Sequence, residues 1–315
     1  MSAGDCRHLA PIIETDRSSS VPASLIPTLP YSMGRHLLMT LAYACIAPHG
    51  GEIIPELASK STLPKFEETR AAMRVLAMRI SKTHPHTIVI ASPHNLRLSS
   101  RIAVVISENS SGTLNGSSSR SVSLHARCDV DLGKILLTQC EREDLPVVGS
   151  NYGTATGSSS DMQMDWGTLV PLWFVLKEQK LKSKILIVTP SREIPLRTNF
   201  VFGQLLGRLL SKDRTRKFVF IASADQAHAH SRKGPYGFSP AASKYDDFVL
   251  RAIRDNSLKR ILRLKPGFVE EAKPDSLWQM VILAGMNEVV PMRCELLSYQ
   301  VPSYYGMACA GFEPN

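Results

Sequence analysis

Leu-Ala-Tyr-Ala-Cys-Ile-Ala-Pro-His-Gly, residues 41–50, and Thr-Ile-Val-Ile-Ala-Ser-Pro-His-Asn, residues 87–95, share one arrangement. In each stretch, an apolar run typical of a buried strand is followed by a proline and a histidine. Because proline fixes the local backbone, the next side chain has a defined direction. If the two strands are neighbours in one sheet, His49 and His94 both emerge at its carboxyl edge, where open α/β sheets bind ligands.

The rest of the chain alternates short apolar runs with longer amphipathic segments, which is typical of an α/β protein. We predict strands at 41–47, 87–92, 102–107, 184–189, 217–222 and 294–300. We predict helices at about 64–82, 131–142, 168–178, 197–211, 244–255 and 274–287. Two segments rich in Ser, Gly and Asn, 110–121 and 149–161, are expected to be loops. The predicted fold is therefore α/β, a single domain with a central mixed, partly parallel sheet flanked by helices.

The first 38 residues differ from the rest. They contain three consecutive serines, four prolines and no clear periodicity, so we expect a flexible N-terminal extension at 1–38 and one folded domain at 39–315. No apolar run approaches the roughly 20 residues that a membrane helix needs. The six cysteines form no CxxC pair, which argues against structural zinc or a disulfide scaffold and favours the cytoplasm.

The chain carries a net charge of +9. Nucleic-acid binding requires basic residues gathered on one face, whereas the densest basic runs, 212–217 and 259–265, look like helix ends or surface turns. We therefore expect neither a nucleic-acid nor a membrane partner. The positive charge instead favours attraction of anionic small molecules, such as aromatic carboxylates.

The histidines at the carboxyl edge would need a carboxylate to complete a metal site. Two imidazoles and one carboxylate can bind a divalent metal and leave coordination positions open. Asp275 lies at the start of the predicted helix 274–287, where it fits either a helix cap or a metal ligand. Glu52, Glu56 and Glu288 are competing carboxylates.

A further cluster, Ala-Ser-Ala-Asp-Gln-Ala-His-Ala-His (222–230), also follows an apolar run. A neutral histidine near a metal can move protons, and His228 is a candidate for this role. A polar loop that happens to contain histidine explains the segment about equally well. His84 and His86 precede the strand at 87, so we expect them at the opposite end of the sheet as surface residues.

The segment Asp165-Trp166-Gly167 precedes a predicted helix. Asp165 fits a helix cap, and Trp166 could form the wall of a pocket for a planar ring. An ordinary cap and a core tryptophan are at least as compatible with the local sequence.

Taken together, these segments resemble the class III extradiol ring-cleavage dioxygenases, the superfamily of the protocatechuate 4,5-dioxygenase catalytic subunit. The motifs that carry the resemblance are Pro48-His49-Gly50, Ser92-Pro93-His94, the segment 165–172, Ser223–His228 with Gly234-Pro235-Tyr236-Gly237, and the helix Asp275–Gly285. The resemblance runs from about Met39 to the C-terminus, and it implies that 39–315 form an extradiol dioxygenase-like catalytic domain.

The resemblance implies a non-haem Fe(II) centre with His49 and His94 as histidine ligands. It places the acidic ligand at Asp275, where the family usually has Glu. His228 matches the catalytic histidine of the family. The chain departs from the family at Trp166, which stands where a second family histidine lies in an Asp-His-Gly motif.

This departure affects the expected chemistry. Trp166 becomes a candidate ring-stacking residue of the active site, and one acid/base group is lost unless His230 or His125 substitutes for it. By resemblance, the protein inserts O2 into a catechol-like or aminophenol-like ring, with a small aromatic substrate and O2 as its partners. We expect a homo-oligomer.

Two alternatives use the same residues. A metal-binding member of the superfamily without dioxygenase activity is one, because Memo-like proteins resemble this superfamily and serve other roles. A metal-dependent hydrolase that activates water, with zinc in place of iron, is the other.

Overall fold

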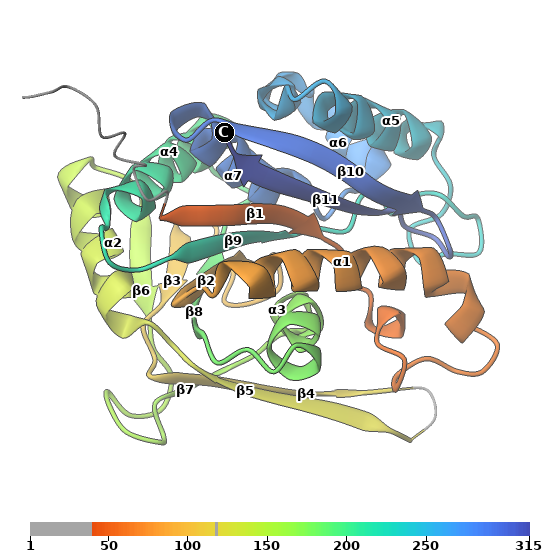
Figure 1. Cartoon of the computed structure of the whole chain (residues 1–315). Helices are drawn as coiled ribbons and strands as arrows, with labels where there is room; N and C mark the ends of the chain where they lie inside the picture. Colours follow the sequence, from red (N-terminus) through yellow and green to blue (C-terminus); the bar gives the residue numbers. More distant parts are fainter. Residues whose placement is uncertain (1–39, 117–118) are drawn as a thin grey trace, which may run out of the picture. The chain divides into compact units, whose positions relative to one another are not determined.

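The computed structural model describes residues 40–116 and 119–315, which belong to one compact unit. The flexible extension expected at 1–38 lies outside the described residues. A large mixed sheet has the strand order β10-β11-β1-β9-β2-β8-β3-β6, and a smaller sheet has the order β5-β4-β7 (Figure 1). The strands are β1 (Leu41–Ala47), β2 (Thr87–Ala91), β3 (Ile102–Val105), β4 (Asn109–Asn115), β5 (Ser121–Arg127), β6 (Val147–Ser150), β7 (Asp161–Gln163), β8 (Lys184–Thr189), β9 (Phe218–Ser223), β10 (Met292–Gln300) and β11 (Met307–Pro314).

Helices cover both faces of the large sheet (Figure 1). The α-helices are α1 (Glu67–Thr83), α2 (Val130–Arg142), α3 (Trp166–Leu172), α4 (Leu196–Lys212), α5 (Pro240–Arg254), α6 (Pro266–Ala272) and α7 (Leu277–Val289). Short helical segments lie at Gly51–Ile53, Leu63–Phe66, Trp173–Glu178 and Leu258–Arg263. Among the described residues, no helix combines the length and the apolar character needed to cross a bilayer.

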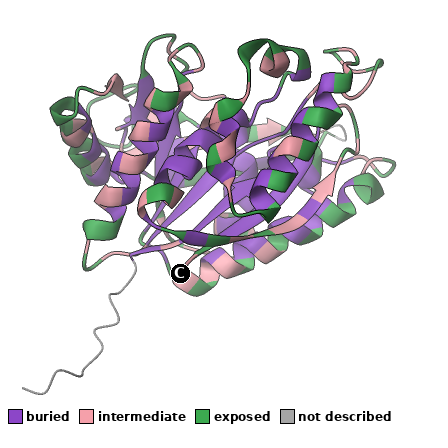
Figure 2. Cartoon of the chain, turned by 90° about the horizontal axis from the view of Figure 1, so that it is seen from above, coloured by how far each residue is buried: buried purple, intermediate pink, exposed green. Residues whose placement is uncertain are grey.

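The central strands are buried on both sides, as Figure 2 shows. Successive side chains of a strand point to opposite faces, so each strand contributes to two cores. In β9, Phe218 and Phe220 belong to the core under α4, α5 and α7, whereas Val219 and Ile221 belong to the core under α1 and α3. This double burial explains why these strands read as continuous apolar runs in the sequence.

The sheet confirms the predicted α/β class and its partly parallel character. Strands β1, β9, β2 and β8 run parallel to one another, whereas β11 pairs with β1, and β3 with β8, in the antiparallel sense. The two strands that precede His49 and His94 are not neighbours in the sheet, because β9 lies between β1 and β2. Both strands still end at the same edge, since all three run in one direction.

Several predicted element bounds were wrong. The segment 110–121 is not a loop, because β4 and β5 form a hairpin there; residues 117–118 lie outside the described part. The expected loop 149–161 includes the end of β6 and the start of β7. The hairpin was missed because β4 is rich in Ser, Gly and Asn, and only the alternation of buried and exposed residues in β5 marks a strand. Strand β11 was not predicted.

Helices α4 and α7 pack closely at two glycines. A Cβ atom on Gly285 would lie 2.1 Å from the carbonyl oxygen of Phe200, and one on Gly203 would lie 2.1 Å from that of Ile282. Real contacts of this kind do not occur at such distances, so a side chain there would push the helices apart. The close approach sets the packing of α7, the helix that Asp275 precedes.

We predict that Gly285→Ala lowers the free energy of unfolding by about 2–4 kcal/mol, because overpacking a helix contact displaces backbone. Chemical denaturation followed by circular dichroism measures the effect. Gly267→Ala in α6 is the matched control, since nothing lies within 4 Å of the added carbon. Equal stability of the Gly285 variant and the wild type would refute the close packing.

Candidate metal centre

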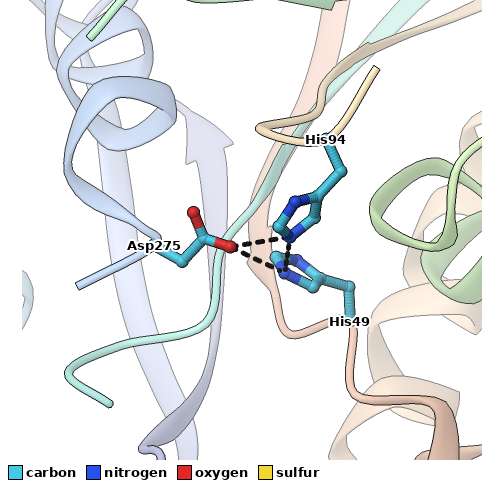
Figure 3. A group of neighbouring side chains, drawn as sticks. All are labelled: His49, His94 and Asp275. Atoms are coloured by element: carbon cyan, nitrogen blue, oxygen red, sulfur yellow. Dashed lines mark hydrogen bonds and ion pairs between the residues drawn. The ribbon is translucent and has the colours of Figure 1, made fainter. Parts of the chain in front are cut away.

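Three loops at the carboxyl edge of the sheet bring His49, His94 and Asp275 together (Figure 3). His49 follows β1, His94 follows β2, and Asp275 precedes α7. The two Nε2 atoms lie 3.1 Å apart. Asp275 Oδ2 lies 2.7 Å from the Nε2 atom of His94 and 3.5 Å from that of His49. The structure thus brings together all three residues that the sequence suggested as metal ligands.

The spacing of these atoms suits one divalent ion. Ligand atoms about 2.1 Å from a metal and about 90° apart lie about 3.0 Å from one another. The three observed separations, 2.7, 3.1 and 3.5 Å, bracket this value. Two imidazole nitrogens and one carboxylate oxygen are also the donor set of a three-ligand site with open positions.

The tautomer of His49 follows from its hydrogen bonds. The hydroxyl of Ser223 donates to the carbonyl oxygen of Gly167, so it must accept from His49 Nδ1, 2.9 Å away. A proton on Nδ1 leaves the lone pair of the neutral ring on Nε2, directed at His94 and Asp275. A hydrogen bond to the second ring nitrogen fixes the tautomer and the orientation of a metal-binding histidine.

Asp275 is held from two sides. Arg192 donates from Nη2 to its Oδ1 atom, which leaves Oδ2 facing the histidines. The guanidinium of Arg192 also lies 4.7 Å above the ring of Trp278. Gln279 donates to the carbonyl oxygens of both Asp275 and Ser223, each at 2.8 Å, so the start of α7 is tied to the end of β9.

The loop that carries His94 is fixed by Asp165. The Asp165 carboxylate caps α3 through the backbone N–H of Thr168 at 3.0 Å, which confirms the predicted cap, and it accepts from Ser92 Oγ at 2.6 Å. A Cβ atom on Gly167 would lie 2.5 Å from that same hydroxyl and 3.2 Å from the ring of His94. Glycine is therefore required for α3 to approach the histidine.

A second buried carboxylate, Asp225, adds negative charge beside His49. Its Oδ2 atom lies 3.3 Å from His49 Nε2, and its Oδ1 atom accepts from the His49 backbone N–H at 2.9 Å. Burial lowers the pKa of His49, but Asp225 and Asp275 outweigh burial and raise it above the ordinary value. Burial would raise the pKa of Asp275, but His49 and His94 hold it well below its usual range. The cluster therefore favours bound positive charge, supplied by protons or by a metal ion.

A cavity of about 1080 Å³ opens beside the centre. Its lining includes His94, Asp275, His228 and apolar side chains of α6 and α7. It also includes the charged side chains Arg97, Arg192, Glu193, Glu270 and Lys273. His228 Nδ1 donates to the carbonyl oxygen of Gln226 at 2.9 Å, so Nε2 of the neutral ring is free to accept a proton. Burial lowers the pKa of His228 below its ordinary value, which keeps the ring neutral near pH 7.

Two tyrosines fix the plane of His228. Tyr305 stacks on it with ring centres 5.1 Å apart and an interplanar angle of 12°, and Tyr236 meets it edge-on at 5.5 Å. Burial raises the pKa of Tyr305 well above its ordinary value, so its hydroxyl remains protonated. Tyr236 lines the cavity and is half exposed.

Trp166 packs on a metal-ligand candidate. Its ring stacks on His94 with ring centres 4.0 Å apart and an interplanar angle of 28°. The side chain is 47% exposed, so Trp166 is not a core residue. It borders the large cavity and also a second cavity of about 370 Å³ beside Glu52 and Leu114. Trp166 thus forms a wall between two cavities at the edge of the centre.

The other suggested residues lie outside the His49–His94–Asp275 cluster. Glu288 pairs with Lys259 at 2.7 Å, and Glu56 is exposed. Glu52 borders the second cavity. Neither suggested substitute for the missing family histidine is placed for that role, because His230 is bonded to the buried Asp246 at 2.8 Å and His125 is exposed on β5.

Sequence reasoning missed Arg192, Asp225 and Ser223 as parts of the centre. Arg192 had a detectable signal, because Pro-Ser-Arg (190–192) follows β8 much as Ser-Pro-His (92–94) follows β2. Ser223 and Asp225 lie in the segment that suggested His228. Their partners are distant in the sequence, so only the fold shows their roles.

Comparison with known proteins gives a family and a fold. Residues 43–310 match the family model described as the catalytic LigB subunit of aromatic ring-opening dioxygenase. Protein CA_C1420 of Clostridium acetobutylicum is 25% identical over 262 residues, which cover 83% of this chain and 55% of that protein. The chain thus spans about half the length of this relative. The crystal structure of uncharacterized protein JW3007 from Escherichia coli K12 has a similar fold, with a TM-score of 0.53, 16% identity, and coverage of 86% of this chain and 99% of that chain.

We predict that Ser223→Ala weakens binding of a divalent metal by about tenfold or more, because the His49 ring loses the acceptor that sets its tautomer. Titration of the metal-free protein with Co(II), followed by calorimetry, measures the affinity. Ser243→Ala, an exposed change on α5, is the control. Unchanged metal affinity in the Ser223 variant would show that this hydroxyl does not orient His49 for metal binding.

Proposed function

The chain belongs to the family of the catalytic LigB subunit of aromatic ring-opening dioxygenases, and we propose that it is itself a non-haem Fe(II) extradiol dioxygenase. Its substrate would be a catechol-like or aminophenol-like ring, and O2 its second substrate. The observation that carries the proposal is the convergence of His49, His94 and Asp275 next to the large cavity. A cytoplasmic location, a homo-oligomer and the absence of nucleic-acid and membrane partners stay predictions.

In this proposal, His49, His94 and Asp275 hold the iron. Three protein donors would leave coordination positions for two adjacent oxygen or nitrogen atoms of the ring substituents. A bound ferrous ion supplies the electron transfer that reaction with O2 requires. Zinc is the alternative metal, since the same donors also suit it.

His228 acts as the general base and later as the general acid. Its Nε2 atom is free to accept because Nδ1 is bonded to the Gln226 carbonyl. A neutral ring in a cavity wall can take a proton from a substrate hydroxyl and return it later in the reaction. Tyr305 and Tyr236 keep the ring in place for both transfers.

Trp166 provides a flat surface for the substrate ring. Its exposed face borders the cavity, while its other face is packed on His94. Aromatic rings prefer offset stacking, which would hold the substrate in the plane needed to reach the centre. Apolar side chains of α6 and α7 also line the cavity and would contact the substrate ring.

The second candidate function is a metal-binding role without ring cleavage, as in Memo-like proteins, or zinc-dependent hydrolysis. The observation that favours it is Trp166 itself, because the family histidine at this position is absent and neither His125 nor His230 replaces it. Loss of one acid/base group would leave His228 as the single histidine besides His94 lining the large cavity.

Metal analysis followed by oxygen uptake tests the proposal. We expect protein purified without air to retain or take up Fe(II) and to consume O2 with members of a catechol panel, forming a yellow ring-fission product. His49→Ala should lose the iron, whereas His86→Ala, an exposed change, should keep it. Bound zinc without oxygen uptake by the wild type would favour the second function.

We predict that His228→Ala retains the metal but lowers kcat by about 10²–10⁴-fold, the usual effect of losing a general base. Steady-state kinetics combined with metal analysis separates the two effects. Because burial lowers the pKa of His228, the part of the activity loss that comes from protonation of His228 should appear only below the ordinary histidine range. Full activity of the variant would exclude His228 from proton transfer.

A further inference from the structure

A third cavity, at the opposite edge of the sheet from the candidate metal centre, has the character of an anion site. It has a volume of about 450 Å³ and is lined by His84, Pro85, His86, Thr87, Asp129, Lys182, Lys184 and Arg216. These residues precede or begin the adjacent parallel strands β2, β8 and β9, or precede α2. We propose that this amino-edge cavity binds the phosphate group of a small molecule.

The loops that form the cavity are bonded to one another. His86 exchanges hydrogen bonds with Lys217, its N–H donating to the Lys217 carbonyl at 2.8 Å and its Nδ1 accepting from the Lys217 N–H at 3.2 Å. On the other side, Lys184 N–H donates to the His86 carbonyl at 2.9 Å, and Ser183 Oγ donates to the Pro85 carbonyl. The scaffold is therefore built before any ligand arrives, which reduces the entropy cost of binding.

Positive charge in the cavity exceeds negative charge. Asp129 is its one lining carboxylate, and that group is already engaged by Thr87 Oγ1, by the Leu132 N–H that it caps, and by Arg216 at 3.5 Å. Among the described residues, neither Lys182 nor Lys184 has a carboxylate partner. Two lysines without a carboxylate partner thus line the cavity, against one carboxylate that is already engaged.

Two further groups give the site directional donors. His86 uses Nδ1 as an acceptor, so its Nε2 atom carries a proton and can donate to an anion. Arg216 is anchored by Asp213 at 2.8 Å and lies 5.2 Å above the ring of Phe218, which restricts its side chain. A fixed guanidinium, an imidazole N–H and two ammonium groups match the several acceptor oxygens of a phosphate.

The size of the cavity indicates more than a bare phosphate. Ligand cavities that hold drug-sized molecules have volumes of about 300–1,000 Å³, and the observed 450 Å³ lies within that range. A phosphate monoester would place its charged group against the lysines and leave room for its remaining atoms. Inorganic phosphate presents the same group without the rest.

Calorimetric titration of the full chain with inorganic phosphate and with adenosine monophosphate, at low ionic strength, tests the proposal. We expect saturable binding of both, with the monoester at least as tight. Lys182→Ala/Lys184→Ala should weaken both affinities by about tenfold or more, and Lys182→Arg/Lys184→Arg should retain most of the binding. Thermal unfolding of each variant shows that it is folded.

Two control variants distinguish binding in this cavity from a general effect of positive charge and from binding at the candidate metal centre. Lys65→Ala/Lys244→Ala removes the same charge from exposed positions elsewhere and should leave binding intact. His49→Ala/His94→Ala should also bind phosphate normally, so the result does not depend on the proposed dioxygenase function. Absence of saturable binding at millimolar phosphate, or an equal loss in the Lys65/Lys244 variant, would overturn the proposal.

Discussion

The geometry of the candidate metal centre depends on the hydroxyl of Ser223. This hydroxyl lies at the end of β9, between the two strands whose loops carry the histidines, and it bonds both His49 and the start of α3. The carbonyl of the same residue accepts from Gln279, which also holds the backbone of Asp275. One residue thus sets the ring of His49 and links three separate elements. Strand β9, which lies between β1 and β2, therefore connects the loop that carries His49 with the helix that follows Asp275.

The electrostatics of the centre follow from this packing. Two carboxylates and two imidazole nitrogens converge in a space where His49 is 1% exposed. Acceptors held this close repel one another unless positive charge lies between them. Arg192 neutralises only the outer oxygen of Asp275, so the inner oxygen and the nitrogens remain available. A cluster of this kind is stabilised when a cation binds to it, and the surrounding residues hold its side chains in position.

The sequence was informative wherever an apolar run was followed by a fixed turn. Three kinds of feature could be predicted because their causes are local. They are the strands buried on both faces, the Pro-His pairs after two of these strands, and the helix cap at Asp165. The order of the strands could not be predicted, since pairing of β1 with β9 depends on contacts between distant residues. Asp225 and Arg192 escaped notice because each matters through a partner elsewhere in the chain. The β4–β5 hairpin was missed because a sheet with one solvated face admits Ser, Gly and Asn.

The wide separation of His49, His94 and Asp275 along the chain has a kinetic consequence. No two of these residues come from adjacent strands, so the site is complete only after β1, β9, β2 and α7 have assembled. Folding that relies on contacts between distant residues is slow, because the entropy cost of loop closure comes before the stabilising contacts form. A metal ion bound by these three residues would therefore join at the last stage of folding, and it would slow unfolding more than it would speed folding.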